Sequence, residues 1–192
     1  MGAVITGIAR TPLGKFGGAL APLRAVTLGS EAIKGALQRS KLDPARIDEV
    51  IFGQVLQAGE GQITARQAAV GAGVPMTVPS TTVNKVCLSG MTAIAMADRS
   101  VRLGEASFVI AGGMESMSNA PYLTPSARWG ARMGDAQLID VMMHDGLWCA
   151  FDHCAMGESS DSKNAALGIS REQQDAWAAE SHRRAVQAVE AG

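Results

Sequence analysis

The sequence predicts an α/β fold in which helices cover the faces of a mixed or parallel sheet. Two observations carry this prediction. Short apolar segments alternate with helix-length segments between residues 3 and 113, and glycines and prolines separate them. The composition agrees, because 47% hydrophobic and 18% charged residues are typical of a globular chain rather than a disordered one.

The predicted elements follow one another in the order βαβαβαβ. Strands are expected at residues 3–9, 50–52, 81–83 and 106–111. Helices are expected at about 27–40, with Thr27 as the cap, at 63–72 and at 88–103. From Leu88 to Ala97 the only polar side chains are Ser89 and Thr92, so we expect this last helix to be buried on all sides.

The pattern changes after Ser118. Residues 119–168 contain short polar stretches, several methionines and no sustained periodicity, so we predict a long loop or an excursion from the sheet. A helix is expected to start at Ser170, because Ser170 and Gln173 have the spacing of a capping box and apolar residues follow at helical intervals.

Charge and cysteine content limit the partners and the compartment. A net charge of −1 gives no basic surface for nucleic acid or for a membrane, and no run of 18 apolar residues is present. The first residues have no basic and apolar pattern of a secretory signal. The three cysteines, an odd and small number, suit a reducing compartment. We therefore expect a cytoplasmic protein that binds neither nucleic acid nor membrane.

Cys87 is the candidate nucleophile. It follows a predicted strand and a short turn, and it is expected at the first residue of helix 88–103. The first N–H groups of a helix lack intrahelical partners and the helix dipole is positive there, so both stabilise a thiolate and an oxyanion formed beside it. On this geometry alone, the alternative of a buried cysteine that acts as a small apolar residue stays open.

The segment NKVCLSGM at residues 84–91 resembles the nucleophile motif of the thiolases, the acetyl-CoA acetyltransferase family. Other segments that resemble thiolase motifs occur in the family's order, so the resemblance spans the chain. They are RTPLG at 10–14, GQVL at 53–56, AGGMESMS at 111–118, MGD at 133–135, DGL at 145–147, MG at 156–157 and SREQQD at 170–175. The segment at 112–117 favours a thiolase over the ketoacyl synthases, which are the alternative within this fold.

The resemblance implies half of a five-layered α-β-α-β-α fold, built on a βαβαβ unit. Residues 1–118 would be the thiolase N-terminal domain with the nucleophile, and residues 119–192 an incomplete loop domain that covers the active site and helps to bind coenzyme A. Cys87 would accept an acyl group from an acyl-CoA, and Leu147 and Met156 would line the pantetheine and acyl pocket. The family resemblance also implies a homodimer or tetramer, a place in fatty acid metabolism such as β-oxidation, and no resident cofactor.

The chain departs from the family pattern in two ways. The Gly-His-Pro motif and the Cys-x-Gly-Gly motif of the thiolase C-terminal half do not occur in it. The alternative to a working acyltransferase is thus a catalytically incomplete fragment, or one subunit of a split enzyme, with the missing half supplied in cis or in trans. Ala155 also stands where many thiolases have a histidine. The nearby cysteines, Cys149 and Cys154, lack zinc-site spacing, so we expect no metal.

Overall fold

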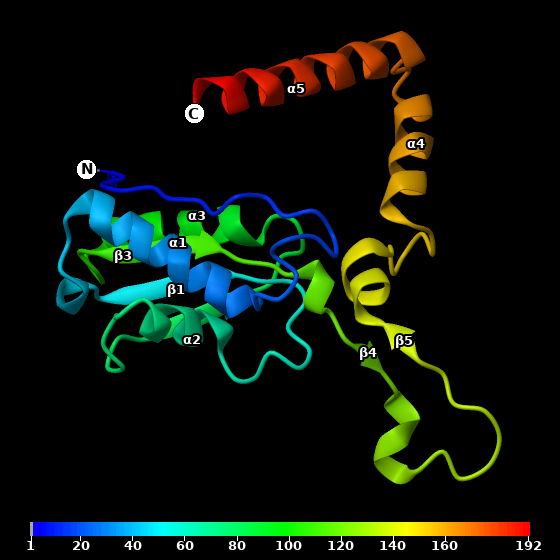
Figure 1. Cartoon of the computed structure of the whole chain (residues 1–192), viewed down its shortest axis with the longest axis horizontal. Coiled ribbons are helices and arrows are strands. Elements are labelled where there is room, and N and C mark those ends of the chain that lie inside the picture. Colours follow the sequence, from blue (N-terminus) through cyan, green and yellow to red (C-terminus); the bar gives the residue numbers. More distant parts are fainter. Residues whose placement is uncertain (1) are drawn as a thin grey trace. The chain divides into compact units, whose positions relative to one another are not determined.

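The centre of the fold is a three-stranded parallel sheet with the order β2-β1-β3. Its strands are β1 (Glu49–Gly53), β2 (Ser80–Val83) and β3 (Val109–Gly113). The computed structural model describes residues 2–192, and the chain divides into two compact units, Met1–Gly146 and Leu147–Gly192. The sheet belongs to the first unit (Figure 1), and the predicted α/β fold with a parallel sheet is confirmed.

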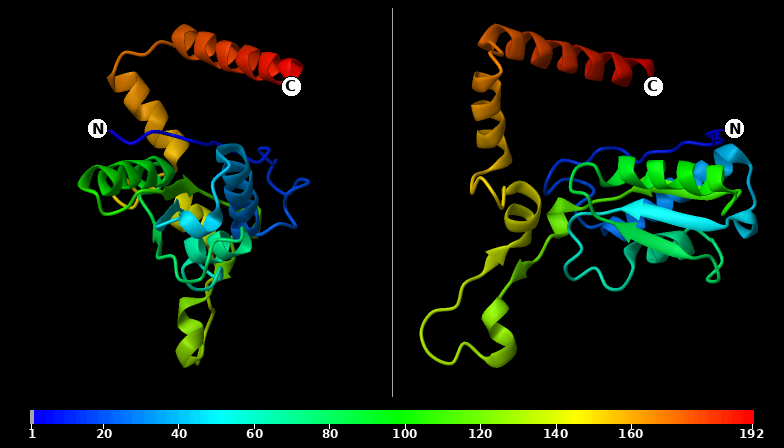
Figure 2. Two further views of the ribbon diagram at one scale, coloured as in Figure 1. Left: turned by 90° about the vertical axis from the view of Figure 1, so that its left-hand side faces the viewer. Right: turned by 180° about the vertical axis from the view of Figure 1, so that it is seen from behind.

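Three helices cover the two faces of this sheet, as Figures 1 and 2 show. They are α1 (Ala25–Ser40), α2 (Thr64–Gly71) and α3 (Ser89–Leu103). Alternate side chains of β1 point to opposite faces: Val50 and Phe52 join the apolar core with α1 and α2, while Gly53 lies against the start of α3. α1 begins at Ala25 and not at the predicted Thr27, and its first residue follows Arg24 without a side-chain cap.

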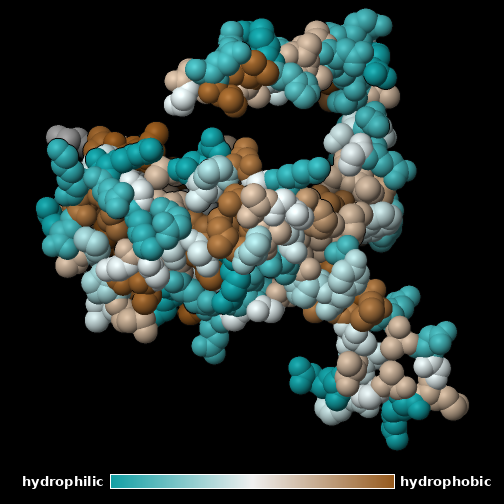
Figure 3. Space-filling model, viewed as in Figure 1, coloured by the Kyte–Doolittle hydropathy of each residue, from teal (hydrophilic) through white to brown (hydrophobic). Residues whose placement is uncertain are grey.

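The predicted strand at residues 3–9 is wrong. This segment is extended but belongs to no sheet, and the side chains of Val4, Ile5 and Ile8 are exposed. Brown, apolar side chains are visible beside the grey first residue in Figure 3. Its backbone makes hydrogen bonds to side chains of two helices. Asp98 of α3 accepts the Ala3 N–H, and Arg39 of α1 donates to the Ile8 carbonyl. An apolar extended sequence needs a sheet edge to become a strand, and here helices lie beside it.

The prediction that helix 88–103 is buried on all sides is also wrong for this chain. Ala93 and Ser100 of α3 are buried, whereas Met91 and Ile94 are 67% and 52% exposed. The sheet covers one side of α3, and within the first unit no second layer lies over Met91 and Ile94. The apolar sequence of α3 therefore predicts more burial than the first unit gives this helix.

Most of the remaining elements lie in the part that the sequence predicts as a loop. In the first unit, β4 (Tyr122–Leu123) and β5 (Ile139–Asp140) form a short antiparallel pair. Short 3-10 turns occur at Pro44–Arg46, Met117–Asn119 and Pro125–Trp129, and a π-helical turn spans Met142–Leu147. In the second unit, α4 (Met156–Ala166) was not predicted, because it buries no residue and so has no apolar stripe.

The last helix confirms the capping prediction. α5 (Arg171–Ala191) starts after Ser170, whose hydroxyl accepts the Gln173 N–H at 3.3 Å, while Gln173 Oε1 accepts the Ser170 N–H at 2.8 Å. The division into domains 1–118 and 119–192 stays a prediction. Among residues 2–192, no helix is both long and apolar enough to cross a membrane.

Candidate active site

The three parallel strands end at the same edge of the sheet, where Gly53 is in register with both Val83 and Gly113. The chain leaves this edge in three segments, 54–56 after β1, 84–88 after β2 and 114–118 after β3. Because the strands are parallel, residues far apart in the sequence meet here. The candidate nucleophile lies in the second of these segments.

Cys87 is exposed and lies in the turn between β2 and α3. The helix starts at Ser89 with Leu88 as its N-cap, so the prediction that Cys87 is the first helical residue is wrong by two positions. The reason is a pair of tight turns before the helix. Leu88 donates its N–H to the Lys85 carbonyl at 3.1 Å, and Ser89 donates to the Val86 carbonyl at 3.0 Å.

Two side chains hold this turn. The buried Ser89 hydroxyl accepts the Lys85 N–H at 2.8 Å and donates to the Val86 carbonyl at 2.6 Å. Asn84 Oδ1 accepts the Val86 N–H at 2.9 Å. Val86 has φ of 48°, a left-handed conformation that a β-branched residue rarely adopts. Strain of this kind persists only where the surrounding contacts enforce it, and it is concentrated at functional sites.

The start of α3 also offers hydrogen-bond donors. Within residues 2–192, the N–H groups of Gly90 and Met91 donate to no protein acceptor, as expected for the first turn of a helix. These groups point along the helix axis toward the turn that carries Cys87. They form a partly positive site for an anion or an oxyanion.

Glu115 joins two of the three edge segments. It follows β3, and its carboxylate accepts the N–H groups of Val55 and Leu56 at 2.8 and 3.1 Å. Asn84 Nδ2 in turn donates to the Val55 carbonyl at 3.4 Å. Glu115 therefore ties the segment after β1, which also touches the turn of Cys87, to the end of β3.

The pKa of Glu115 is raised above its ordinary value. Burial is the main cause, the two backbone hydrogen bonds act against it, and the nearby Glu60 carboxylate adds to the rise. Between the ordinary pKa of 4.5 and the raised pKa of the folded state, the folded protein binds more protons than the unfolded one. The contribution of Glu115 to the free energy of unfolding is therefore present at low pH and is lost as the pH rises through its folded pKa.

We expect the side-chain carboxyl carbon of Glu115 to titrate above pH 4.5 in a carbon-detected NMR titration, because burial disfavours its charged form. Glu115→Gln removes the resonance and identifies it. Glu180 is a suitable internal reference, since ion pairs with Arg183 and Arg184 lower its pKa. A Glu115 signal that titrates at or below that of Glu180 would contradict the expectation.

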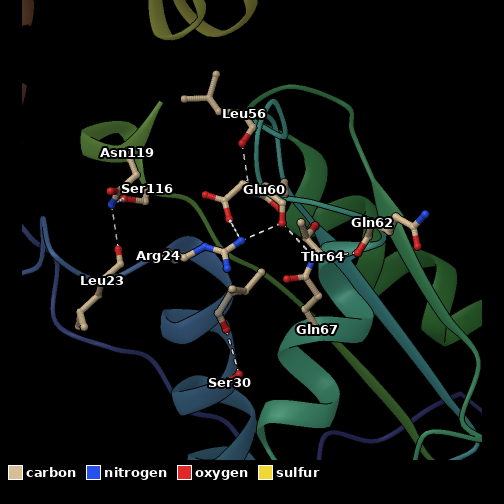
Figure 4. A network of polar contacts seen from close by, with 12 residues as sticks. Leu23, Arg24, Ser30, Leu56, Glu60, Gln62, Thr64, Gln67, Ser116 and Asn119 are labelled. Carbon is tan, nitrogen blue, oxygen red and sulfur yellow. Dashed lines mark hydrogen bonds and ion pairs between the residues drawn. The ribbon is translucent and has the colours of Figure 1, made fainter. Parts of the chain in front are cut away.

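A second polar network is built around Glu60, whose carboxylate also acts on the pKa of Glu115, and is drawn in Figure 4. Arg24 Nη2 donates to the Glu60 carboxylate at 3.0 Å and to the Glu60 carbonyl at 2.8 Å. Gln67 Nε2 donates to the same carbonyl at 2.9 Å. These contacts fix the loop after β1 against the start of α1 and the first part of α2.

The two predicted pocket residues, Leu147 and Met156, belong to the second unit. They flank a closed turn, because Trp148 and Ala155 form an antiparallel bridge and Cys149 donates its N–H to the Cys154 carbonyl at 2.9 Å. Leu147 and Met156 thus directly precede and follow the two bridged residues at the base of one turn. Among residues 2–192, no group of three or more His, Cys, Asp or Glu side chains is arranged to hold a metal ion.

Glu115 and Ser89 are the site residues that sequence reasoning did not assign. Both lie inside matching motifs, but their contacts are made through space. A carboxylate directly after an apolar strand was the available signal for Glu115, since such a residue lies at the carboxyl edge of the sheet. The hydroxyl of Ser89 gave no comparable signal.

The fold and this edge define an α/β protein that presents a thiol in a strained turn before a helix, an arrangement typical of nucleophilic cysteines. Comparison with known proteins gives the family. The family model for the thiolase N-terminal domain matches residues 3–192, so the chain belongs to the thiolase family.

The similar curated proteins share this family. The chain is 51% identical over 188 residues to acetyl-CoA acetyltransferase 2 of Arabidopsis thaliana, covering 98% of this chain and 47% of the relative. It is 48% identical over 189 residues to an acetyl-CoA acetyltransferase of Pseudomonas aeruginosa, covering 98% and 48%. A Yarrowia lipolytica acetyl-CoA acetyltransferase is 47% identical over 190 residues, covering 99% and 47%. The chain spans about half the length of these relatives.

Proposed function

We propose that the protein transfers acyl groups between acyl-CoA thioesters through an S-acyl intermediate on Cys87, as an acetyl-CoA C-acetyltransferase or 3-oxoacyl-CoA thiolase. The observation that carries this proposal is the turn 84–88, which holds an exposed cysteine before the free N–H groups of α3. The names of the relatives support acetyl-CoA as a substrate.

The chemistry follows from the turn. The Cys87 sulfur attacks the thioester carbonyl, and the negative charge that forms on the carbonyl oxygen is stabilised by N–H groups at the helix start, the Cys87 N–H among them. The C–S bond to coenzyme A then breaks, coenzyme A leaves as a thiolate that takes up a proton, and the acyl group stays on Cys87. A second acyl-CoA, deprotonated at its α-carbon, attacks this acyl group and releases the cysteine.

The full reaction needs groups from motifs that this sequence does not contain. We assign the histidine that activates Cys87 and the second cysteine that moves the α-proton to the C-terminal half of the whole protein, in cis or in trans. This agrees with the span of about half of each relative. The isolated chain is then an incomplete catalyst, which is the second candidate function.

The finer assignments belong to the same proposal. Leu147 and Met156 contact the pantetheine and the acyl group, and their position at the base of one turn supports a joint role. The three cysteines support a cytoplasmic location. On the family resemblance, we also assign to the protein a homodimer or tetramer, a place in β-oxidation, and catalysis without a resident cofactor.

The test is the mass of the intact chain after incubation with acetyl-CoA. We expect a gain of one acetyl group, mapped to the tryptic peptide Val86–Arg99, and no gain in Cys87→Ser. Cys149→Ser and Cys154→Ser are matched controls that should be acetylated like the wild type. Acetylation that persists in Cys87→Ser would overturn the proposal. No acetylation of a folded wild-type chain would favour the incomplete fragment, and adding the C-terminal half should then restore it.

A further inference from the structure

Cys149 and Cys154 face each other across the turn of the second unit. The antiparallel bridge between Trp148 and Ala155 puts these two cysteines directly opposite one another as the next pair toward the turn. Cys149 donates its N–H to the Cys154 carbonyl at 2.9 Å, which agrees with this register, while the Cys149 carbonyl accepts the His153 N–H at 2.9 Å. Both thiols are free and half-buried.

This register suits a disulfide. Opposite residues of an antiparallel pair have Cα atoms about 4.5–5.5 Å apart, and disulfides need about 4.4–6.8 Å. Opposite residues also project their side chains to the same side of the ribbon. We propose that Cys149 and Cys154 are a redox-active pair that hydroperoxides oxidise reversibly to an intramolecular disulfide.

The surroundings give the two sulfurs different roles. Cys149 Sγ accepts the Asp152 N–H at 3.3 Å, which orients this sulfur within the turn. Burial raises the pKa of the Cys154 thiol, and the carboxylates of Glu158 and Asp152 raise it further. Lys163, which lies 3.9 Å from the Asp152 carboxylate, acts in the opposite direction. Cys149 therefore attacks the peroxide, and Cys154 resolves the product.

The steps balance as a two-electron oxidation. The Cys149 thiolate attacks one peroxide oxygen, the O–O bond breaks, and a sulfenic acid forms while the leaving hydroxide or alkoxide takes up a proton. The Cys154 sulfur then attacks the Cys149 sulfur, the S–S bond forms and the S–O bond breaks. The departing hydroxide takes the Cys154 proton and leaves as water, so the two thiols lose the two electrons that the peroxide gains.

The resulting bond should be easy to reduce. Opposite Cβ atoms in a strand pair lie about 4.5–5.5 Å apart, whereas a disulfide prefers about 3.5–4.5 Å, so the turn must tighten to close it. His153 in this turn already has φ of 53°. Strained or exposed disulfides have oxidising potentials and are the reversible ones. Closure would also fix the spacing of Leu147 and Met156 at the base of the turn.

The test oxidises the whole chain with about one equivalent of hydrogen peroxide, blocks remaining thiols with N-ethylmaleimide in denaturant and digests with trypsin. Both cysteines lie in one peptide, Met133–Lys163, and Cys87 lies in another, Val86–Arg99. We expect Met133–Lys163 to be unblocked and two hydrogens lighter, and dithiothreitol to restore two blocked thiols. The same treatment in urea should give markedly less disulfide, because the register is lost.

Variants separate the roles, and circular dichroism verifies that each one folds. Cys154→Ser should leave a sulfenic acid on Cys149 that dimedone traps, whereas Cys149→Ser should leave Cys154 as a thiol. Cys87→Ser should form the disulfide as the wild type does, so the result does not depend on the proposed acyl transfer. Two blocked thiols in Met133–Lys163 after oxidation, a link between that peptide and Val86–Arg99, or equal disulfide formation in urea would overturn the proposal.

Discussion

Replacing Gly53 with alanine is expected to lower the free energy of unfolding of the first unit by about 3 kcal/mol, at the upper end of the range for overpacked sites. A Cβ atom at Gly53 would lie 2.6 Å from the Ser89 carbonyl carbon and 2.7 Å from the Gly90 nitrogen. These are backbone atoms of the first turn of α3, so no side-chain rotation can relieve the contact. The helix start must move away from β1.

Gly90→Ala is the matched control, because it adds the same methyl group to the first turn of α3, the segment that Gly53 contacts. Its Cβ would meet the Gly112 carbonyl at 3.8 Å, an ordinary van der Waals distance. We therefore expect no loss of stability in urea unfolding, and a small gain from the better helix former. Equal stability of Gly53→Ala and Gly90→Ala would show that α3 shifts without cost and would contradict the close packing of β1 on the helix start.

The same substitution should reach Cys87. Ser89, which the new methyl group would displace, holds the turn through its contacts to Lys85 and Val86. We therefore expect the alkylation rate of Cys87 to change in Gly53→Ala and to stay near the wild-type value in Gly90→Ala. The stability loss and the altered thiol reactivity have a single cause, the position of the first turn of α3.

The parts of the fold that the sequence predicts are those with a strong local signal. β1, β2, β3 and the three helices around them were expected within a few residues, because short apolar runs bounded by glycine or proline, and helical spacing, are local properties. The strand at 3–9 and the full burial of α3 failed for another reason. Both predictions depend on which residues pack against the segment, and the side chains of Ile5 and Met91 are exposed.

The candidate site divides in the same way. Cys87 was found because a motif and a helix start coincide, and its helical position was off by two because tight turns at Lys85 and Val86 precede the helix. Glu115 could not be assigned a partner from sequence, since Val55 lies 60 residues earlier and the register of β1 with β3 brings them together.

Arg24→Ala is expected to destabilise the first unit by about 1–2 kcal/mol. The Glu60 side chain is only 9% exposed, and removing Arg24 leaves its carboxylate without the cation that compensates burial. The Arg24 side chain is 52% exposed, so water screens the pair and the loss falls below that of a fully buried ion pair. Urea unfolding at neutral pH measures the change.

A double-mutant cycle isolates the charge. In the Arg24→Ala background, Glu60→Gln should recover part of the lost stability, because a neutral amide costs less to bury than an unpaired carboxylate. In the wild-type background, the same Glu60→Gln change should be destabilising, because it removes the charge that Arg24 pairs with. The sign of the Glu60→Gln effect therefore reverses with Arg24 present or absent. Costs that simply add, within about 0.5 kcal/mol, would mean that Arg24 acts through its bond to the Glu60 carbonyl and not through the ion pair.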